Sequence, residues 1–201
     1  GLLGSMLWRA SRLPALAGLA ILCGYVALQW VQQQRALVFG EQYAQAQGLA
    51  DYQVAALPRP LSPFNWSVYV TAGEQYRVAH VNLRRARTPP PAAAHDSIIR
   101  RLSVGYRPLH DAQWQVIERF GAVGAERELA REAWSHSELG FYRWFAAFPM
   151  LDHIERGNPA TCVWFRDARF DIPGRETRLF HYGLCRKPDE AAWHLYKLNS
   201  D

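Results

Sequence analysis

The stretch LPALAGLAILCGYVALQWV, Leu13–Val31, contains 19 residues without a formal charge and decides how the chain is organised. A helix rises about 1.5 Å per residue, so this stretch would be roughly 29 Å long, close to the thickness of the hydrocarbon core of a bilayer. Basic residues flank it at Arg9, Arg12 and Arg35. Residues 1–35 are therefore predicted to form a transmembrane helix with basic flanks.

The same stretch allows two other interpretations. A cleaved signal peptide would share the basic start and the apolar residues, although no A-x-A cleavage pattern follows. A deeply buried core helix would also be apolar around its whole circumference. For a spanning helix, the two arginines before it against one after it favour a cytoplasmic N-terminal side and an external domain.

The residues that follow predict a stalk and then a soluble domain. Residues 36–57 are rich in Ala, Gln and Leu, which favour a helical stalk. The prolines of residues 57–63, LPRPLSP, then end the helix, so the soluble domain is expected to occupy residues 58–201. Within it, residues 64–83 predict a β-hairpin that turns at Ala72–Gln75, because β-branched and aromatic residues fill both sides.

Helices are predicted in the middle of the chain and strands at its end. The helices are expected over residues 95–104, 112–120, 125–134 and 137–148, the second of them capped by Asp111. The strands are expected over residues 161–170, 177–186 and 193–198. Strands, then helices, then strands predict an α+β fold, in which one N-terminal transmembrane helix precedes a mainly antiparallel sheet with inserted helices.

Composition excludes several classes of protein. The chain has 201 residues, of which 49% are hydrophobic and 20% charged, so it is neither wholly disordered, collagen-like nor a disulfide-dense mini-protein. The net charge is +5, and only Lys187 and Lys197 are lysines, so the basic residues are almost all arginine. For a membrane-tethered domain, anionic lipid headgroups come before nucleic acid as a partner, and no nucleic-acid partner is expected.

The cysteines give a geometric clue. If the C-terminal hairpin is centred on residues 173–174, residues whose numbers add up to 347 face each other, and Cys162 and Cys185 meet this condition. Opposed residues lie at a distance that a disulfide tolerates. Either the two form a cross-strand disulfide in an oxidising compartment, or both are reduced and buried. Cys23 lies in the apolar stretch and is expected to be inert.

Candidate metal ligands are few. A hydrolytic metal site needs several imidazole and carboxylate groups that converge on one ion. The pairs His95–Asp96 and His110–Asp111 are weak candidates, because such dipeptides are common and Asp111 has the competing capping role. No Gly-rich phosphate loop, nucleophile elbow, H-E-x-x-H or paired C-x-x-C motif occurs.

Two groups of residues allow a binding interpretation beside a simpler structural one. A candidate interaction surface is basic enough for phosphate groups, although a plain solvated surface is the simpler interpretation, and consists of Arg84, Arg85, Arg87, Arg100 and Arg101. The aromatic residues of the segment 141–148 have helical spacing and are most simply core, with a partner- or membrane-facing patch as the alternative.

Several motifs together resemble a known family. They are PRPLSPFNWSVYV (residues 58–70), YRV (76–78), FYRWF (141–145), VWFRDARF (163–170) and RLFHYGLCR (178–186). The pattern resembles the C-terminal part of the LexA-regulated, inner-membrane, metal-dependent hydrolase family of bacteria. The most specific piece is the PLSPFNW block, and the DxRF strand supports it.

The resemblance implies a function but assigns no catalytic residue. The family's metal ligands lie in its N-terminal membrane half, in motifs of the forms P-D-x-D and H-R-G-x-T-H-S, and neither occurs here. It implies the C-terminal portion of a bacterial inner-membrane hydrolase without its catalytic half, packed against further transmembrane helices, with any divalent metal bound elsewhere. The alternative is a non-enzymatic, membrane-anchored module that binds a protein partner or anionic lipid.

Overall fold

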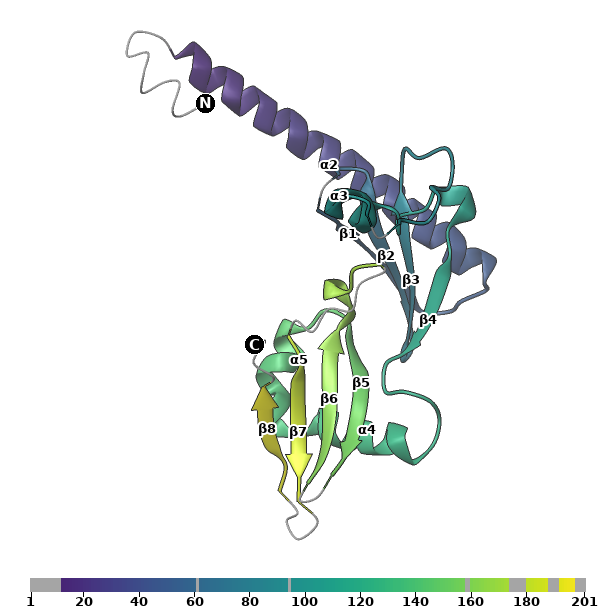
Figure 1. The fold of residues 1–201 in the computed structure, drawn as a ribbon, viewed down its shortest axis with the longest axis vertical. Helices are drawn as coiled ribbons and strands as arrows, with labels where there is room; N and C mark the ends of the chain where they lie inside the picture. The colour runs from purple at the N-terminus through teal and green to yellow at the C-terminus, as the bar shows by residue number, and fades with distance from the viewer. Residues whose placement is uncertain are drawn as a thin grey trace.

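The computed structural model describes residues 12–60, 62–93, 95–157, 160–173, 180–187 and 192–197. Parts of the predictions, including Arg9 and most of the turn after Pro173, lie outside these residues. Within them the fold is α+β, with one long helix and two four-stranded antiparallel sheets (Figure 1). The main elements are α2 (Leu13–Ala46), β1 (Tyr52–Pro58), β2 (Asn65–Ala72), β3 (Gln75–Asn82), α3 (Ile98–Ser103), β4 (Trp114–Glu118), α4 (Ala125–Ser135), α5 (Gly140–Phe145), β5 (Pro149–Arg156), β6 (Thr161–Asp167), β7 (Tyr182–Arg186) and β8 (His194–Lys197).

The predicted helical stalk of residues 36–57 is wrong in its second half. The helix ends at Ala46, just before Gly48 takes a left-handed φ of 62°, and residues 52–58 form strand β1. The helical part is not a free stalk either. A stripe of residues that recur every fourth position is buried against β1 and β2, and consists of Gln32, Ala36, Gly40 and Ala44. The small side chains in this stripe let the helix approach the sheet closely.

Sheet A, made of β1–β2–β3–β4, is covered on both faces. Trp66 and Val68 pack with Ala36 beneath α2, while Tyr69 faces the other way and stacks on Phe148 at 4.0 Å between ring centroids. The predicted hairpin is confirmed, since Ala72 pairs with Gln75 across the turn. Strand β2 is therefore the centre of the structure.

Strand β4 replaces a predicted helix. Residues 112–120 were expected to be helical behind an Asp111 cap, but Trp114–Glu118 pairs antiparallel with β3. Asp111 instead ends a short 3₁₀ turn. The open edge of β3 offers hydrogen bonds to a segment that contains Val116 and Ile117, and this pairing outweighs the weak local helix preference.

Sheet B, made of β5–β6–β7–β8, packs against α4 and α5. Helix α4 was predicted within one residue, but the expected helix over 137–148 shortens to a 3₁₀ turn and α5, and the following strand β5 was not predicted. Sheet A and sheet B meet where Leu151 N donates to Arg119 O at 2.7 Å and Tyr69 Oη donates to Ala168 O at 2.8 Å.

The close packing of α2 gives a test of its docking. A Cβ on Gly40 would lie 2.5 Å from Val54 Cγ1 and 2.8 Å from Val68 Cγ1, whereas a Cβ on Gly24 would meet nothing within 4 Å. Gly40→Leu is expected to lower the free energy of unfolding by about 2–3 kcal/mol, because the packed neighbours must move. Denaturant unfolding in detergent measures it. Gly24→Leu is the matched control, and equal stability of the two variants would contradict the docking.

Candidate membrane-proximal surface and buried polar sites

The apolar half of α2 projects from the folded domain. Its hydropathy averages 1.6 over the best 18-residue window, and none of that window is buried against the protein. Ile21 is 74% exposed and Trp30 is 61% exposed. The interpretation as a buried core helix is therefore wrong. The chain has one described helix, α2, that is long and apolar enough to cross a membrane.

Arg35 ties α2 to the folded domain at the place where the apolar half of the helix leaves it. Its guanidinium donates to Gln32 Oε1 at 3.2 Å and to Leu83 O at 3.5 Å. Arg35 lies four residues after Val31, or about 6 Å along the helix axis. Leu83 follows β3, so the segment that connects β3 to β4 starts close to the end of the apolar stretch.

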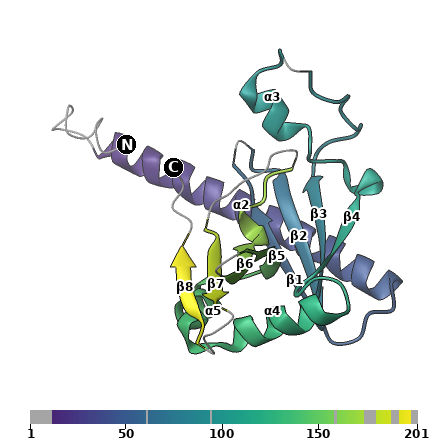
Figure 2. The same cartoon turned by 60° about the horizontal axis from the view of Figure 1, so that its bottom comes forward.

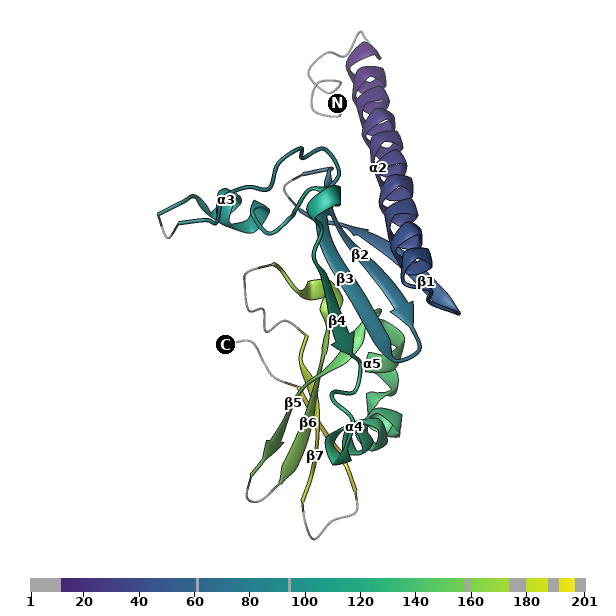
Figure 3. The same cartoon turned by 90° about the vertical axis from the view of Figure 1, so that its right-hand side faces the viewer.

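That segment, residues 84–108, forms an excursion that reaches sideways from sheet A (Figures 2 and 3). It leaves from the end of the sheet at which the apolar half of α2 emerges. Helix α3 lies within it, and Ser97 Oγ caps the helix by accepting from Arg100 N at 3.3 Å. Ile98 is 68% exposed and Ile99 is 64% exposed, so the helix presents apolar side chains to solvent.

The predicted arginine surface belongs to this excursion, but its five members differ. Arg85 turns inward and donates to Ser103 O and Tyr106 O, and burial lowers the pKa of its guanidinium. The other four stay on the surface. Arg84 lies over the Phe64 ring at 4.9 Å, and Arg100 pairs with Asp96 at 2.9 Å. Arg87 and Arg101 are exposed and have no acidic partner among the described residues.

The weak metal candidates are not brought together. Asp96 accepts from Ala93 N and Arg100, and Asp111 accepts from Thr88 and Arg107, so each carboxylate belongs to a separate local structure. Asp111, predicted as a helix cap, is thus a hydrogen-bond acceptor for its own loop. His95 and His110 are exposed. Among the described residues, no group of three or more His, Cys, Asp or Glu side chains could hold a metal ion.

A polar network that the sequence did not predict lies on the face of sheet A that carries Ser67 and Tyr69. Arg59 Nε donates to Ser67 Oγ at 2.6 Å, Ser67 Oγ contacts His80 Nδ1 at 2.6 Å, and the Arg59 guanidinium reaches Tyr69 Oη at 3.2 Å. Burial, helped by the positive charge of Arg59, lowers the pKa of His80 to about 4. Ser67 is fully buried, so this Ser–His contact is structural and is not a nucleophile with its base.

Arg59 also ties the two sheets together, because it donates to Arg169 O at 2.6 Å. Nearby, the fully buried Asp167 accepts from Ala147 N at 2.9 Å and Phe148 N at 3.2 Å and pairs with Arg169 at 2.8 Å. The charged residues at the end of β6 therefore hold neighbouring elements of the fold together. The half-buried guanidinium of Arg59, which lies between two prolines in the sequence, leaves no pattern that would reveal its partners.

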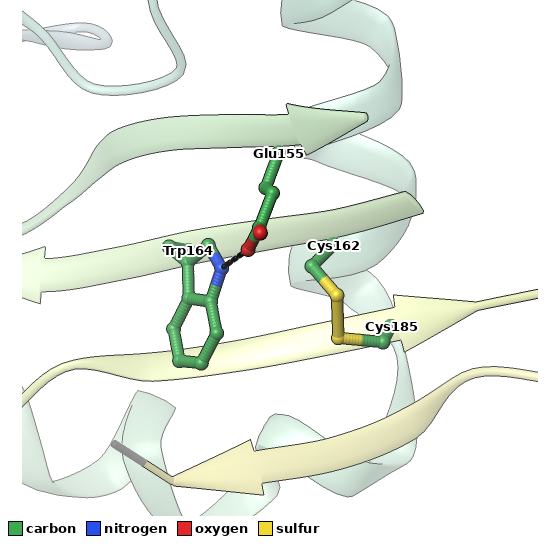
Figure 4. The surroundings of a disulfide bond; sticks show 4 residues. All are labelled: Glu155, Cys162, Trp164 and Cys185. Carbon is green, nitrogen blue, oxygen red and sulfur yellow. Dashed lines mark hydrogen bonds between the residues drawn. A yellow bond between two sulfur atoms is a disulfide. The ribbon is translucent and has the colours of Figure 1, made fainter. Parts of the chain in front are cut away.

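The register of the C-terminal hairpin is as predicted, since Cys162 lies directly opposite Cys185. Their sulfur atoms are joined in a disulfide on the face of sheet B, beside Trp164, whose Nε1 donates to Glu155 Oε2 at 3.4 Å (Figure 4). Cys23 is free and exposed on α2. A disulfide between neighbouring strands is typical of proteins from oxidising compartments.

The aromatic segment 141–148 divides between core and surface. Tyr142 and Phe148 are buried, and Phe145 packs against the core of sheet B. Phe141 and Trp144 are 61% and 80% exposed, because they lie on the opposite side of α5. The core interpretation therefore holds for part of the segment only.

Comparisons with known proteins identify no relative. No family model, curated protein or solved structure matches the chain. The hydrolase family therefore stays a prediction that rests on the sequence motifs.

The low pKa of His80 predicts how stability depends on pH. Between pH 6.5 and about 4 the unfolded chain binds a proton at His80 that the folded chain does not, so stability falls as the pH is lowered through this range. Between pH 7 and pH 4.5 the difference amounts to about 2.5 kcal/mol. Urea unfolding at pH 7 and pH 4.5 measures it. His80→Asn should remove this part of the pH dependence and the exposed control His110→Asn should keep it; equal behaviour would contradict the assignment.

Proposed function

We propose that the chain is a non-catalytic, membrane-anchored binding module whose folded domain rests on the anionic surface of a bacterial inner membrane. The observation that carries the proposal is the position of the arginine- and isoleucine-bearing excursion, which begins beside Arg35, at the base of the apolar half of α2. An anchored domain holds its own charged surface near lipid headgroups without needing high affinity.

Helix α2 supports a retained anchor over a cleaved signal peptide. The helix runs without interruption from Leu13 to Ala46, and its second half packs in the core beneath Trp66 and Val68. Removal of the apolar half would cut into a continuous helix, whereas signal peptides end in an accessible small-residue cleavage site. If the apolar half of α2 spans the bilayer, the contact between Arg35 and Leu83 O would lie next to the lipid headgroups, on the side of the folded domain.

The disulfide supports an external position for the domain. Thiols in the bacterial cytoplasm are kept reduced, so a Cys162–Cys185 bond persists on the periplasmic side. This agrees with the arrangement that the basic residues before the apolar stretch favour. The N-terminal side would then be cytoplasmic and residues 36–201 periplasmic.

The chemistry of the excursion fits anionic lipid. Four surface arginines, Arg84, Arg87, Arg100 and Arg101, can each contribute about 1 kcal/mol beside an anionic membrane. Ile98 and Ile99 can enter the boundary between headgroups and acyl chains, as the apolar residues of interfacial helices do. The prolines of residues 89–91 hold the connecting backbone extended.

The hydrolase hypothesis is a second candidate, favoured by the motif PLSPFNW, whose last two residues begin strand β2. In that case catalysis would belong to a membrane half outside this sequence, and the present domain would cover or support it. Metal-dependent activity of a longer natural chain that contains residues 1–201, and its loss on removal of the added part, would support this candidate.

Hydrogen exchange tests the lipid proposal. The full chain is placed in nanodiscs of zwitterionic lipid or of a mixture with anionic phosphatidylglycerol. The amides of residues 97–104 are expected to exchange at least about fivefold more slowly with the anionic lipid, because lipid contact restrains α3. The effect should disappear in 1 M salt, where charges are screened within about 3 Å.

Matched variants make this experiment specific. The double variant Arg100→Gln/Arg101→Gln should lose the lipid-dependent protection, because two of the four surface arginines of the excursion are removed. The control Arg131→Gln/Arg156→Gln removes two exposed charges from the other part of the molecule and should retain it. Equal exchange in neutral and anionic nanodiscs, or equal behaviour of both double variants, would contradict lipid contact.

A further inference from the structure

A cavity of about 370 Å³ lies on the face of sheet A that is turned away from α2. Its walls come from the start of β1, the end of β2, the start of β3, the residue after β4, and the segment that leads from α5 into β5. Gln53 and Thr71, which pair across β1 and β2, supply polar groups, and Ala55, Phe148 and Pro149 supply apolar surface. The volume falls at the lower end of the range for small-molecule sites.

Arg119 lines this cavity and makes no close ion pair with a carboxylate of the described residues. Its guanidinium carbon lies 5.0 Å from the ring centroids of both Phe120 and Trp134, so two aromatic rings hold the side chain in place. Its buried Nε has no hydrogen-bond partner in the described part of the chain. A partly buried guanidinium whose Nε lacks an acceptor costs folding free energy. A bound anion at this position would supply the acceptor and the opposite charge.

A second arginine lines the same cavity. Arg143 Nη1 donates to Trp134 O at 2.6 Å and to His136 O at 2.7 Å. These carbonyls fix the direction of the guanidinium but do not neutralise it. Arg143 and Arg119 therefore hold two positive charges at one cavity, on two different elements of the fold.

The neighbouring acids are already paired with other arginines. Glu74 pairs with Arg131, and Glu118 pairs with Arg127 at 2.9 Å. No carboxylate belongs to the cavity wall. The buried Asp167 is directed to the backbone N–H groups of the 146–149 segment, which leaves the two guanidinium groups as the charged groups of the wall.

We propose that this cavity binds a small organic carboxylate, with its charged group at Arg119 and Arg143 and its apolar body against Ala55, Phe148 and Pro149. The planar carboxylate matches the fork of a guanidinium, and Arg119 is already oriented by its rings. The apolar part of the wall distinguishes such a ligand from a bare inorganic anion. The site is separate from the excursion, so it adds a ligand to the membrane module and does not depend on lipid contact.

Calorimetric titration of the full chain in detergent with sodium benzoate tests this. Benzamide has nearly the same shape without the charge, and inorganic phosphate has charge without an apolar body. Saturable benzoate binding is expected, with benzamide and phosphate each at least about tenfold weaker. Equal affinity for benzoate and benzamide, or no saturable benzoate binding, would overturn the proposal.

Variants locate the site. Arg119→Gln and Arg143→Gln should each weaken benzoate about tenfold, while Arg156→Gln, on the outer end of β5, should bind as the natural chain does. Arg143 is exposed, so its variant tests the cavity even if Arg119→Gln fails to fold, and thermal unfolding checks both. Unchanged benzoate affinity in a folded Arg143→Gln variant would overturn the assignment.

Discussion

The close contact between helix α2 and sheet A determines the rest of the structure. Because Gly40 has no side chain, the helix lies directly on Val54 and Val68, and the direction of its exposed apolar half is fixed relative to the domain. A free stalk would leave the domain unoriented. With the helix docked, one end of sheet A faces the level at which a membrane would begin, and that end carries the excursion with α3. Anchor, orientation and surface charge are thus consequences of one helix–sheet contact.

The second sheet extends this arrangement away from the proposed membrane. Arg59 and Tyr69 reach across to residues 168–169, and Tyr69 stacks on Phe148, so the two sheets share the central strand β2 as a common support. The arginines have different structural roles, which depend on their surroundings. Arg84, Arg87, Arg100 and Arg101 of the excursion stay on the surface, whereas Arg59 donates within the protein and Arg119 lines a cavity with its Nε unsatisfied.

The sequence predicted the features that depend on local pattern. Leu13–Val31, the β-hairpin with its turn at Ala72–Gln75, helix α4 and the pairing of Cys162 with Cys185 all follow from hydrophobicity, alternation or spacing. The predictions from sequence were wrong where long-range contacts decide the secondary structure. Residues 52–58 form strand β1 because they pair with β2, and residues 114–118 form strand β4 because they pair with β3. Among candidate sites, the sequence predicted the arginine surface but not the inward turn of Arg85, and the cavity at Arg119 joins five segments that no spacing relates.

The most direct test is the depth of residue 99 in a membrane. A nitroxide is attached to Ile99→Cys on a Cys23→Ala background, in nanodiscs that contain anionic lipid, and its collision rates with oxygen and with a water-soluble nickel chelate are compared. Val123→Cys, a site 84% exposed in the loop before α4, serves as the reference in water. We expect residue 99 to favour oxygen and to be shielded from nickel relative to residue 123. Equal nickel accessibility at the two positions would contradict the account.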